Sequence, residues 1–167
     1  QTGHRGFAGG ALIRSLRLKG MLGDSAMLLT AQDTQFALGS GQFSLTNANL
    51  VLGQGPAPVR LAAARLSGAS LAGGLGGTAH NVQAQIGSIP LLVRDGNAHW
   101  GYAGGVLRVA GSIGIIDAAT PDRFNPARAK DFSLTLADGR IHAGGTITLP
   151  QGDMPIAKVR ITHELAS

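Results

Sequence analysis

The chain has 167 residues, which is enough for one domain with a hydrophobic core and cramped for two. Glycine accounts for 26 residues, about twice its usual share of ~7%, and charged residues for only 14%, which excludes a disordered polyelectrolyte. The net charge is +5. Cysteine is absent, which excludes disulfide scaffolds, thiolate metal sites and cysteine nucleophiles.

The N-terminus reads Gln1-Thr2-Gly3-His4-Arg5, without an initiator methionine or a signal peptide. We therefore expect the chain to be a piece of a longer protein. The longest stretch without formal charge, residues 66–93, contains six glycines and Pro90, so it does not match a transmembrane helix. Any membrane anchor is expected outside this chain.

Apolar and polar residues alternate along almost every segment, as in strands with one buried face. Residues 16–20 read Leu-Arg-Leu-Lys-Gly, and residues 43–46 read Phe-Ser-Leu-Thr. Clusters of glycine, asparagine, aspartate and proline separate the segments, which predicts an antiparallel meander. Further strands are expected at 26–38, 59–66, 82–86, 91–94, 106–115, 132–136, 140–142, 146–149 and 156–163.

Two segments leave room for other structure. Residues 59–66 have good helix propensity, so one short helix is an alternative there. Residues 117–131 contain Pro121, Asn125 and Pro126, which predicts a long loop or one short turn of helix. We expect a single β-rich domain over residues 1–167, with 117–131 as its best internal boundary.

The chain contains one near-repeat. Residues 92–107 and 136–147 each have an Asp-Gly pair near the start and a Gly-Gly pair near the end. We interpret each copy as strand, Asp-Gly turn, short strand, Gly-Gly and strand, because Asp-Gly favours type I′ hairpin turns. Residues 72–75, Ala-Gly-Gly-Leu, resemble a degenerate third copy. A repeated hairpin builds a sheet in one direction, which predicts an elongated body.

Histidines offer no convincing metal site. His99 and His142 occupy the same offset after an Asp-Gly pair, so each has an aspartate nearby. Their spacing matches no ligand motif, and we expect both to point outward from the hairpins. The sequence therefore predicts neither a metal nor a cofactor.

Catalytic motifs are also missing. The nearest match to a G-x-S-x-G nucleophile elbow, residues 68–72, lacks the final glycine, and no lysine follows the glycine of a P-loop. Asp117 could act with Asp122 or Asp131 in acid–base chemistry, but turn chemistry accounts for all three. We expect a protein that is not an enzyme.

Basic charge suggests contact with phosphates of nucleic acid or of lipid headgroups. Nucleic-acid binding would need exposed aromatic residues interleaved with basic ones. Trp100 and Tyr102 lie close together, but Arg94 and Arg108 are isolated around them. We expect the aromatic pair to pack on the sheet and predict no nucleic-acid partner.

The chain resembles C-terminal portions of the YdbH-like members of the AsmA/TamB group of bacterial envelope proteins. The resemblance lies in residues 132–147, Phe-Ser-Leu-Thr-Leu-Ala-Asp-Gly-Arg-Ile-His-Ala-Gly-Gly-Thr-Ile, followed by Pro150 and by residues 159–166, Val-Arg-Ile-Thr-His-Glu-Leu-Ala. Residues 43–50 have a similar pattern of apolar and polar residues. The Asp-Gly-Arg…Gly-Gly hairpin is the most specific part of the resemblance.

This resemblance implies a long, curled β-sheet in the periplasm of a Gram-negative cell, anchored to the inner membrane by a segment outside this chain. An apolar groove along the sheet would bind phospholipid acyl chains and carry phospholipid between the inner and outer membranes. The membranes, or their proteins, would be reached through parts of the protein not present here. The family has no catalytic residues to transfer.

Alternation along the strands selects the residues expected to line such a groove: Leu16, Leu18, Phe43, Leu45, Ile113, Ile115, Phe132, Leu134 and Leu136. The same nine residues would equally suit the core of an ordinary sandwich. Four basic residues could meet headgroups, although solvated positions on the outer face suit them better: Arg17, Lys19, Arg108 and Arg160.

We therefore expect an all-β fold, an elongated and twisted antiparallel meander that can curl into a half-pipe. Lipid binding and transfer is the leading function. A structural or adhesive surface domain, such as a β-solenoid, is the alternative, but the uneven strand spacing argues against regular rungs. A carbohydrate-acting enzyme would need two facing carboxylates, which the sequence does not offer.

Overall fold

A computed structural model describes residues 10–23, 25–149 and 155–165, which form ten strands and no helix. The strands, in chain order, are β1 (Gly10–Leu22), β2 (Ser25–Ala37), β3 (Gln42–Leu52), β4 (Val59–Leu71), β5 (Gly74–Ile86), β6 (Leu91–Ala103), β7 (Val106–Asp117), β8 (Ala127–Ala137), β9 (Arg140–Thr148) and β10 (Pro155–Glu164).

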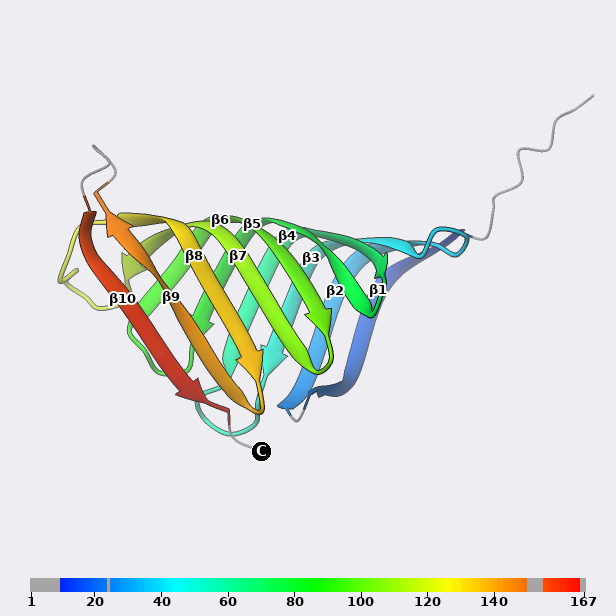
Figure 1. Cartoon of the computed structure of the whole chain (residues 1–167), viewed down its shortest axis with the longest axis horizontal. Helices are drawn as coiled ribbons and strands as arrows, with labels where there is room; N and C mark the ends of the chain where they lie inside the picture. The colour runs from blue at the N-terminus through cyan, green and yellow to red at the C-terminus, as the bar shows by residue number, and fades with distance from the viewer. Residues whose placement is uncertain (1–9, 24, 150–154, 166–167) are drawn as a thin grey trace, which may run out of the picture.

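All ten strands form one antiparallel sheet in which each strand pairs only with its neighbours in sequence (Figure 1). The predicted all-β meander is therefore confirmed. β1 and β10 do not pair with each other, so the sheet is not closed into a barrel. The helical alternative at 59–66 is wrong, because these residues begin β4 and hydrogen-bond to strands on both sides.

The segment 117–131 is shorter as a loop than expected. Residues 118–126 connect β7 to β8, while Asp117 still belongs to β7 and residues 127–131 already belong to β8. The two strands pair with each other, so the sheet is continuous across this segment.

A buried carboxylate holds this loop. The Asp117 side chain has no exposed surface and accepts hydrogen bonds from Arg123 Nε at 2.7 Å and Arg123 Nη2 at 2.6 Å. It also accepts from the backbone N–H groups of Ala119 and Arg123, at 3.0 and 2.7 Å. Arg123 donates in addition to the Pro90 carbonyl at 3.2 Å, which ties the loop to the start of β6. The guanidinium and these N–H donors hold the pKa of Asp117 far below its usual range, although burial opposes the shift.

A line of β-bulges crosses the sheet. Four residues inside strands have positive φ angles between 41° and 51°: Asp33, Asn47, Asn81 and Asp95. Aspartate and asparagine tolerate this conformation better than other residues with a Cβ. Around Asn47, the buried residues Leu45 and Ala48 are three positions apart instead of two. Asn47 and Asn81 lie opposite the same residue, Ala64 of β4, so the bulges are aligned from strand to strand.

The two copies of the near-repeat fold differently. Asp138-Gly139 forms the β8–β9 turn as predicted, with φ angles of 51° and 68°. The prediction for Asp95-Gly96 is wrong, because this pair lies inside β6 and makes a bulge. Conversely, Gly104-Gly105 forms the β6–β7 turn, whereas Gly144-Gly145 lies inside β9. Both pairs can adopt positive φ, so either can serve as turn or strand, and the register of the sheet decides.

The sheet curls so that β7–β10 pass in front of β3–β5 in Figure 1. The core forms where the two parts face each other, from two groups of residues: one on β3–β5, and one on β7–β9 that is not adjacent to it in the sheet. Its buried members are Leu52, Val59, Ile86, Leu107, Leu134, Leu136, Ile141 and Ala143. We call the face turned toward this core the inner face, and the opposite face the outer face.

Contacts between distant hairpins hold the curl. The Leu165 side chain packs against Gly53 in the β3–β4 loop, and His163 Nε2 donates to the Ala57 carbonyl in the same loop at 3.2 Å. The Tyr102 hydroxyl at the end of β6 accepts a hydrogen bond from the N–H of Gly23, in the β1–β2 turn, at 3.2 Å. The end of β10 is thus fixed to the far side of the sheet.

Glycine makes room for the aromatic residues on the inner face. Phe43 and Trp100 pack with ring centroids 5.9 Å apart, and Trp100 Nε1 donates to the Ser67 carbonyl at 3.2 Å. A Cβ at Gly68 would lie 2.7 Å from the Trp100 ring and 2.8 Å from the Phe43 ring. Only glycine therefore fits beneath the pair. Trp100 and Tyr102 both pack on the core, as predicted.

Candidate functional site

The inner face is the candidate site. The strand register places all nine predicted groove residues on it: Leu16, Leu18, Phe43, Leu45, Ile113, Ile115, Phe132, Leu134 and Leu136. Leu16, for example, lies opposite buried Ala31, and Ile113 lies opposite buried Ala129. The alternation in the sequence thus predicted the facing of these side chains.

The nine residues differ in burial. Leu45, Ile113, Leu134 and Leu136 are fully buried by other side chains of this chain. The next four are half-buried: Leu16, Phe43, Ile115 and Phe132. Leu18, on β1, keeps 45% of its surface exposed. The structure therefore divides the set into members of a packed core and members with apolar surface still available.

One row of aliphatic residues runs across eight strands of the inner face. Each member is the register partner of the next, from β1 to β8: Leu18, Leu29, Leu50, Leu61, Ala84, Val93, Ile115 and Ala127. Only the two alanines are buried, whereas all the larger members retain more exposed surface. We call this set the aliphatic row. It contains no polar side chain.

Sequence reasoning missed most of the aliphatic row. Leu29, Leu50, Leu61 and Val93 lie in β2, β3, β4 and β6, each of which carries or faces a bulge. Because a bulge reverses the alternation, the face of a residue beyond it cannot be assigned from strict period two. The signal available in the sequence is a mid-strand aspartate or asparagine with apolar residues three apart.

The four basic residues considered for headgroups lie on the outer face. Arg17 and Lys19 on β1, Arg108 on β7 and Arg160 on β10 are all exposed. Arg17 pairs with Thr30 and Arg160 with Gly144, both outward-facing positions. They therefore do not line the aliphatic row.

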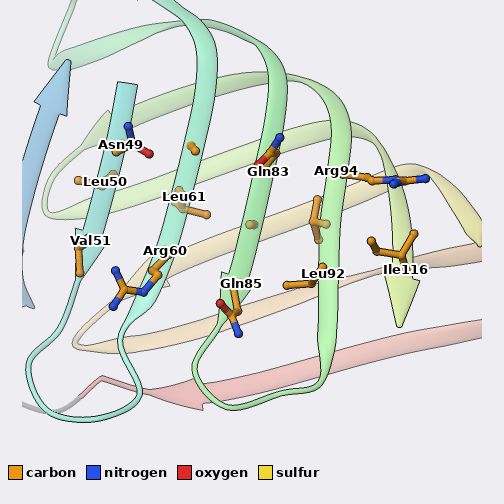
Figure 2. A pocket seen from close by; sticks show the side chains of 13 residues that line it. Asn49, Leu50, Val51, Arg60, Leu61, Gln83, Gln85, Leu92, Arg94 and Ile116 are labelled. Carbon is orange, nitrogen blue, oxygen red and sulfur yellow. The ribbon is translucent and has the colours of Figure 1, made fainter. Parts of the chain in front are cut away.

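A groove runs across β3–β7 (Figure 2). Most of its lining residues point to the outer face, and four members of the aliphatic row also line it: Leu50, Leu61, Ala84 and Val93. Its polar lining comes from Asn49, Arg60, Gln83, Gln85 and Arg94, and its apolar lining includes Leu92 and Ile116. Figure 2 shows Arg60 and Arg94 well apart, with Gln83 and Gln85 between them, so the two guanidinium groups do not converge on one position.

Among the residues that the structure describes, two of the three aspartates considered for acid–base chemistry are held by other groups. Asp117 is engaged by Arg123, and Asp131 accepts hydrogen bonds from the N–H and hydroxyl of Thr146, at 2.7 and 2.8 Å. These two bonds lower the pKa of Asp131, against a smaller opposing effect of burial. His99 and His142 both point outward, as expected, and are exposed. Within the described ranges, no three metal-ligating side chains come together.

The described residues include no helix of the length and apolar character needed to cross a membrane. Comparisons of the chain with protein-family models, with curated proteins and with solved structures gave no match.

Proposed function

We propose that this protein binds phospholipid acyl chains along its inner face and transfers phospholipid between the inner and outer membranes of a Gram-negative cell. The aliphatic row carries this proposal, because it is a continuous apolar path that crosses eight strands and keeps exposed surface on its larger members. The resemblance of residues 132–147 to YdbH-like proteins points to the same function.

The aliphatic row is at least as long as an acyl chain. Eight strands spaced by about 4.8 Å give the aliphatic row a length of roughly 34 Å. An acyl chain on it would exchange one aliphatic neighbour for another, while its headgroup stayed in water. Exposing each CH₂ group costs roughly 0.8 kcal/mol, so an unbroken lining matters more than any single contact, and no covalent step is needed.

The β1 end of the row is the entry point in this proposal. Leu18 is the most exposed member of the row, whereas the β7–β9 region is filled by core side chains. In a longer periplasmic protein anchored in the inner membrane, further parts of the chain would connect this entry to the membranes. Ile113, Leu134 and Leu136 then stabilise the fold and do not contact lipid.

Lipid extraction from purified protein tests the proposal. The chain is expressed in a Gram-negative periplasm, purified, extracted with organic solvent and analysed by mass spectrometry. The test variant is Leu18→Asp, on the inner face of β1. Its matched control is Leu12→Asp on the same strand, because Leu12 is 56% exposed and lies on the outer face.

We expect stoichiometric phospholipid in the wild type and in Leu12→Asp, and at least a fivefold loss in Leu18→Asp. Circular dichroism checks that all three proteins keep the same strand content. Folded wild-type protein without lipid, or equal loss in both variants, would overturn the proposal. That result would favour a structural or adhesive envelope domain without lipid cargo.

A further inference from the structure

The groove across β3–β7, which we call the outer groove, carries polar groups that lipid binding on the inner face does not use. Two arginines and two glutamines project from its middle strands: Arg60 on β4, Gln83 and Gln85 on β5, and Arg94 on β6. None of the described residues that line it is acidic. Its volume of about 550 Å³ lies within the range of ligand pockets, roughly 300–1,000 Å³.

The four side chains follow one another across three neighbouring strands. Arg60 is the register partner of Gln85. Gln83 lies on the same face of β5 two residues away, and it is next to Arg94 because the adjacent residues Ala84 and Val93 are register partners. Strands about 4.8 Å apart and alternate residues about 7 Å apart place the backbone positions of the two arginines roughly 12 Å from each other. The outer groove thus has a cation on either side of two amides (Figure 2).

These side chains are available to a ligand. Arg60, Gln83 and Gln85 are exposed and make no hydrogen bond or ion pair with any residue that the structure describes. Arg94 lies 3.5 Å from the carboxylate of Asp95, but both side chains are more than half exposed, so this contact contributes little.

The chemistry of the four groups defines the ligand. A guanidinium group binds a carboxylate or a phosphate through paired N–H donors, whereas a glutamine amide both donates and accepts hydrogen bonds, as a hydroxyl group does. We propose that the outer groove binds an anionic oligosaccharide. Two of its acidic groups lie on Arg60 and Arg94, and sugar hydroxyl groups between them bind Gln83 and Gln85.

Two other polyanions fit the outer groove less well. β4, β5 and β6 each pair with a strand on both sides, so their backbone N–H and C=O groups are not available to the main chain of an acidic peptide. Nucleic acid would need aromatic side chains on which its bases stack, whereas Phe43, Trp100 and Tyr102 pack on the inner face. An oligosaccharide needs neither, because side chains alone can bind its polar groups.

Calorimetric titration with defined probes tests this inference. The probe is a hyaluronan hexasaccharide, which carries a carboxylate on every second sugar. Its controls are chitohexaose, which has the same number of sugars and no charge, and a peptide of alternating glutamate and alanine. The test variant is Arg60→Ala/Arg94→Ala. The matched control, Arg65→Ala/Arg108→Ala, removes the same charge from exposed arginines that do not line the outer groove.

We expect the hexasaccharide to bind the wild type and the matched control with similar affinity, and the test variant at least about tenfold more weakly. Gln83→Ala/Gln85→Ala should weaken binding about fivefold although its charge is unchanged. Circular dichroism checks that every variant keeps its strand content.

Several results would overturn the inference. They are absence of hexasaccharide binding to folded wild type, binding of chitohexaose or of the acidic peptide at least as tight as that of the hexasaccharide, and equal losses in the two arginine variants. The probes contain no lipid, and none of the substituted residues belongs to the aliphatic row, so the result is independent of the lipid-extraction experiment.

Discussion

The β1–β2 end of the sheet and the β7–β9 region have the same alternating pattern but different surroundings. Leu18 on β1 and Leu136 on β8 both face inward, yet the first is 45% exposed and the second only 2%. Leu136 is covered because the sheet curls and brings residues of β3–β5 across from it. A strand's pattern therefore sets the face of a side chain, whereas burial depends on what the curl places opposite.

Truncation of one leucine in each region gives the largest expected contrast. Leu136→Ala removes a fully buried side chain from the core and should lower the free energy of unfolding by about 3 kcal/mol. Leu18→Ala should lower it by less than about 1 kcal/mol, because that side chain is already partly in water. Urea denaturation measures both. Equal losses would mean that the β1–β2 end is packed in solution.

The acid response should also separate the two regions. The pKa of Asp117 is strongly lowered in the folded protein, so its stabilising contribution is present above about pH 4, the usual aspartate value, and declines as the pH falls below it. We expect the stability of Asp117→Asn to fall less steeply than that of the wild type between pH 5 and pH 2, a range of roughly three units. Thermal denaturation across that range measures the slope.

Asp33→Asn is the matched control at the β1–β2 end. The Asp33 carboxylate lies 4.0 Å from Arg14, and their side chains are 56% and 86% exposed. Asparagine also tolerates the positive φ at this position. We expect a change in unfolding free energy within about 0.5 kcal/mol at neutral pH. If the stability of Asp117→Asn and that of the wild type fell equally steeply with falling pH, the buried carboxylate would not account for the acid sensitivity.

A further effect is expected at the bulge line, whose positive-φ residues lie in β2, β3, β5 and β6. Asn81 has a φ of 51°, where alanine is strained and glycine is not. Asn81→Ala should cost about 1 kcal/mol, and Asn81→Gly should cost less. Ala64→Gly is the control, since Ala64 lies opposite Asn81 without a positive φ. If Asn81→Ala were as stable as Asn81→Gly, the bulge would not require a left-handed residue.

Much of the fold could be predicted from the sequence because strand alternation is a local property. The strands expected at 26–38 and 106–115 nearly coincide with β2 and β7. Two others were predicted too short, and one end of each falls at a bulge, while the separate strands expected at 140–142 and 146–149 are one strand, β9. The strand expected at 91–94 stops at Asp95, and the one at 82–86 begins after Asn81, whereas β6 and β5 continue through these residues. An aspartate or asparagine that adopts a positive φ inside a strand cannot be distinguished from a turn residue by the sequence alone.

The burial differences within the candidate site could not be predicted in the same way. Leu134 and Leu18 have equivalent patterns, and only the curl distinguishes a buried side chain from one that keeps exposed surface. The curl depends on long-range contacts such as Leu165 with Gly53, which leave no periodic signal in the sequence. Asp95-Gly96 and Asp138-Gly139 make the same point, because identical dipeptides became a bulge and a turn.

The nearest-neighbour order of the strands has a consequence for length. Because every strand pairs only with the strands before and after it, removing two consecutive strands leaves the remaining ones antiparallel and in the same order. Removal of β4 and β5, for example, would bring β3 beside β6, and both carry a bulge at which the partner's bulge can align. A sheet of this kind can be lengthened or shortened by whole hairpins during evolution without rethreading the chain.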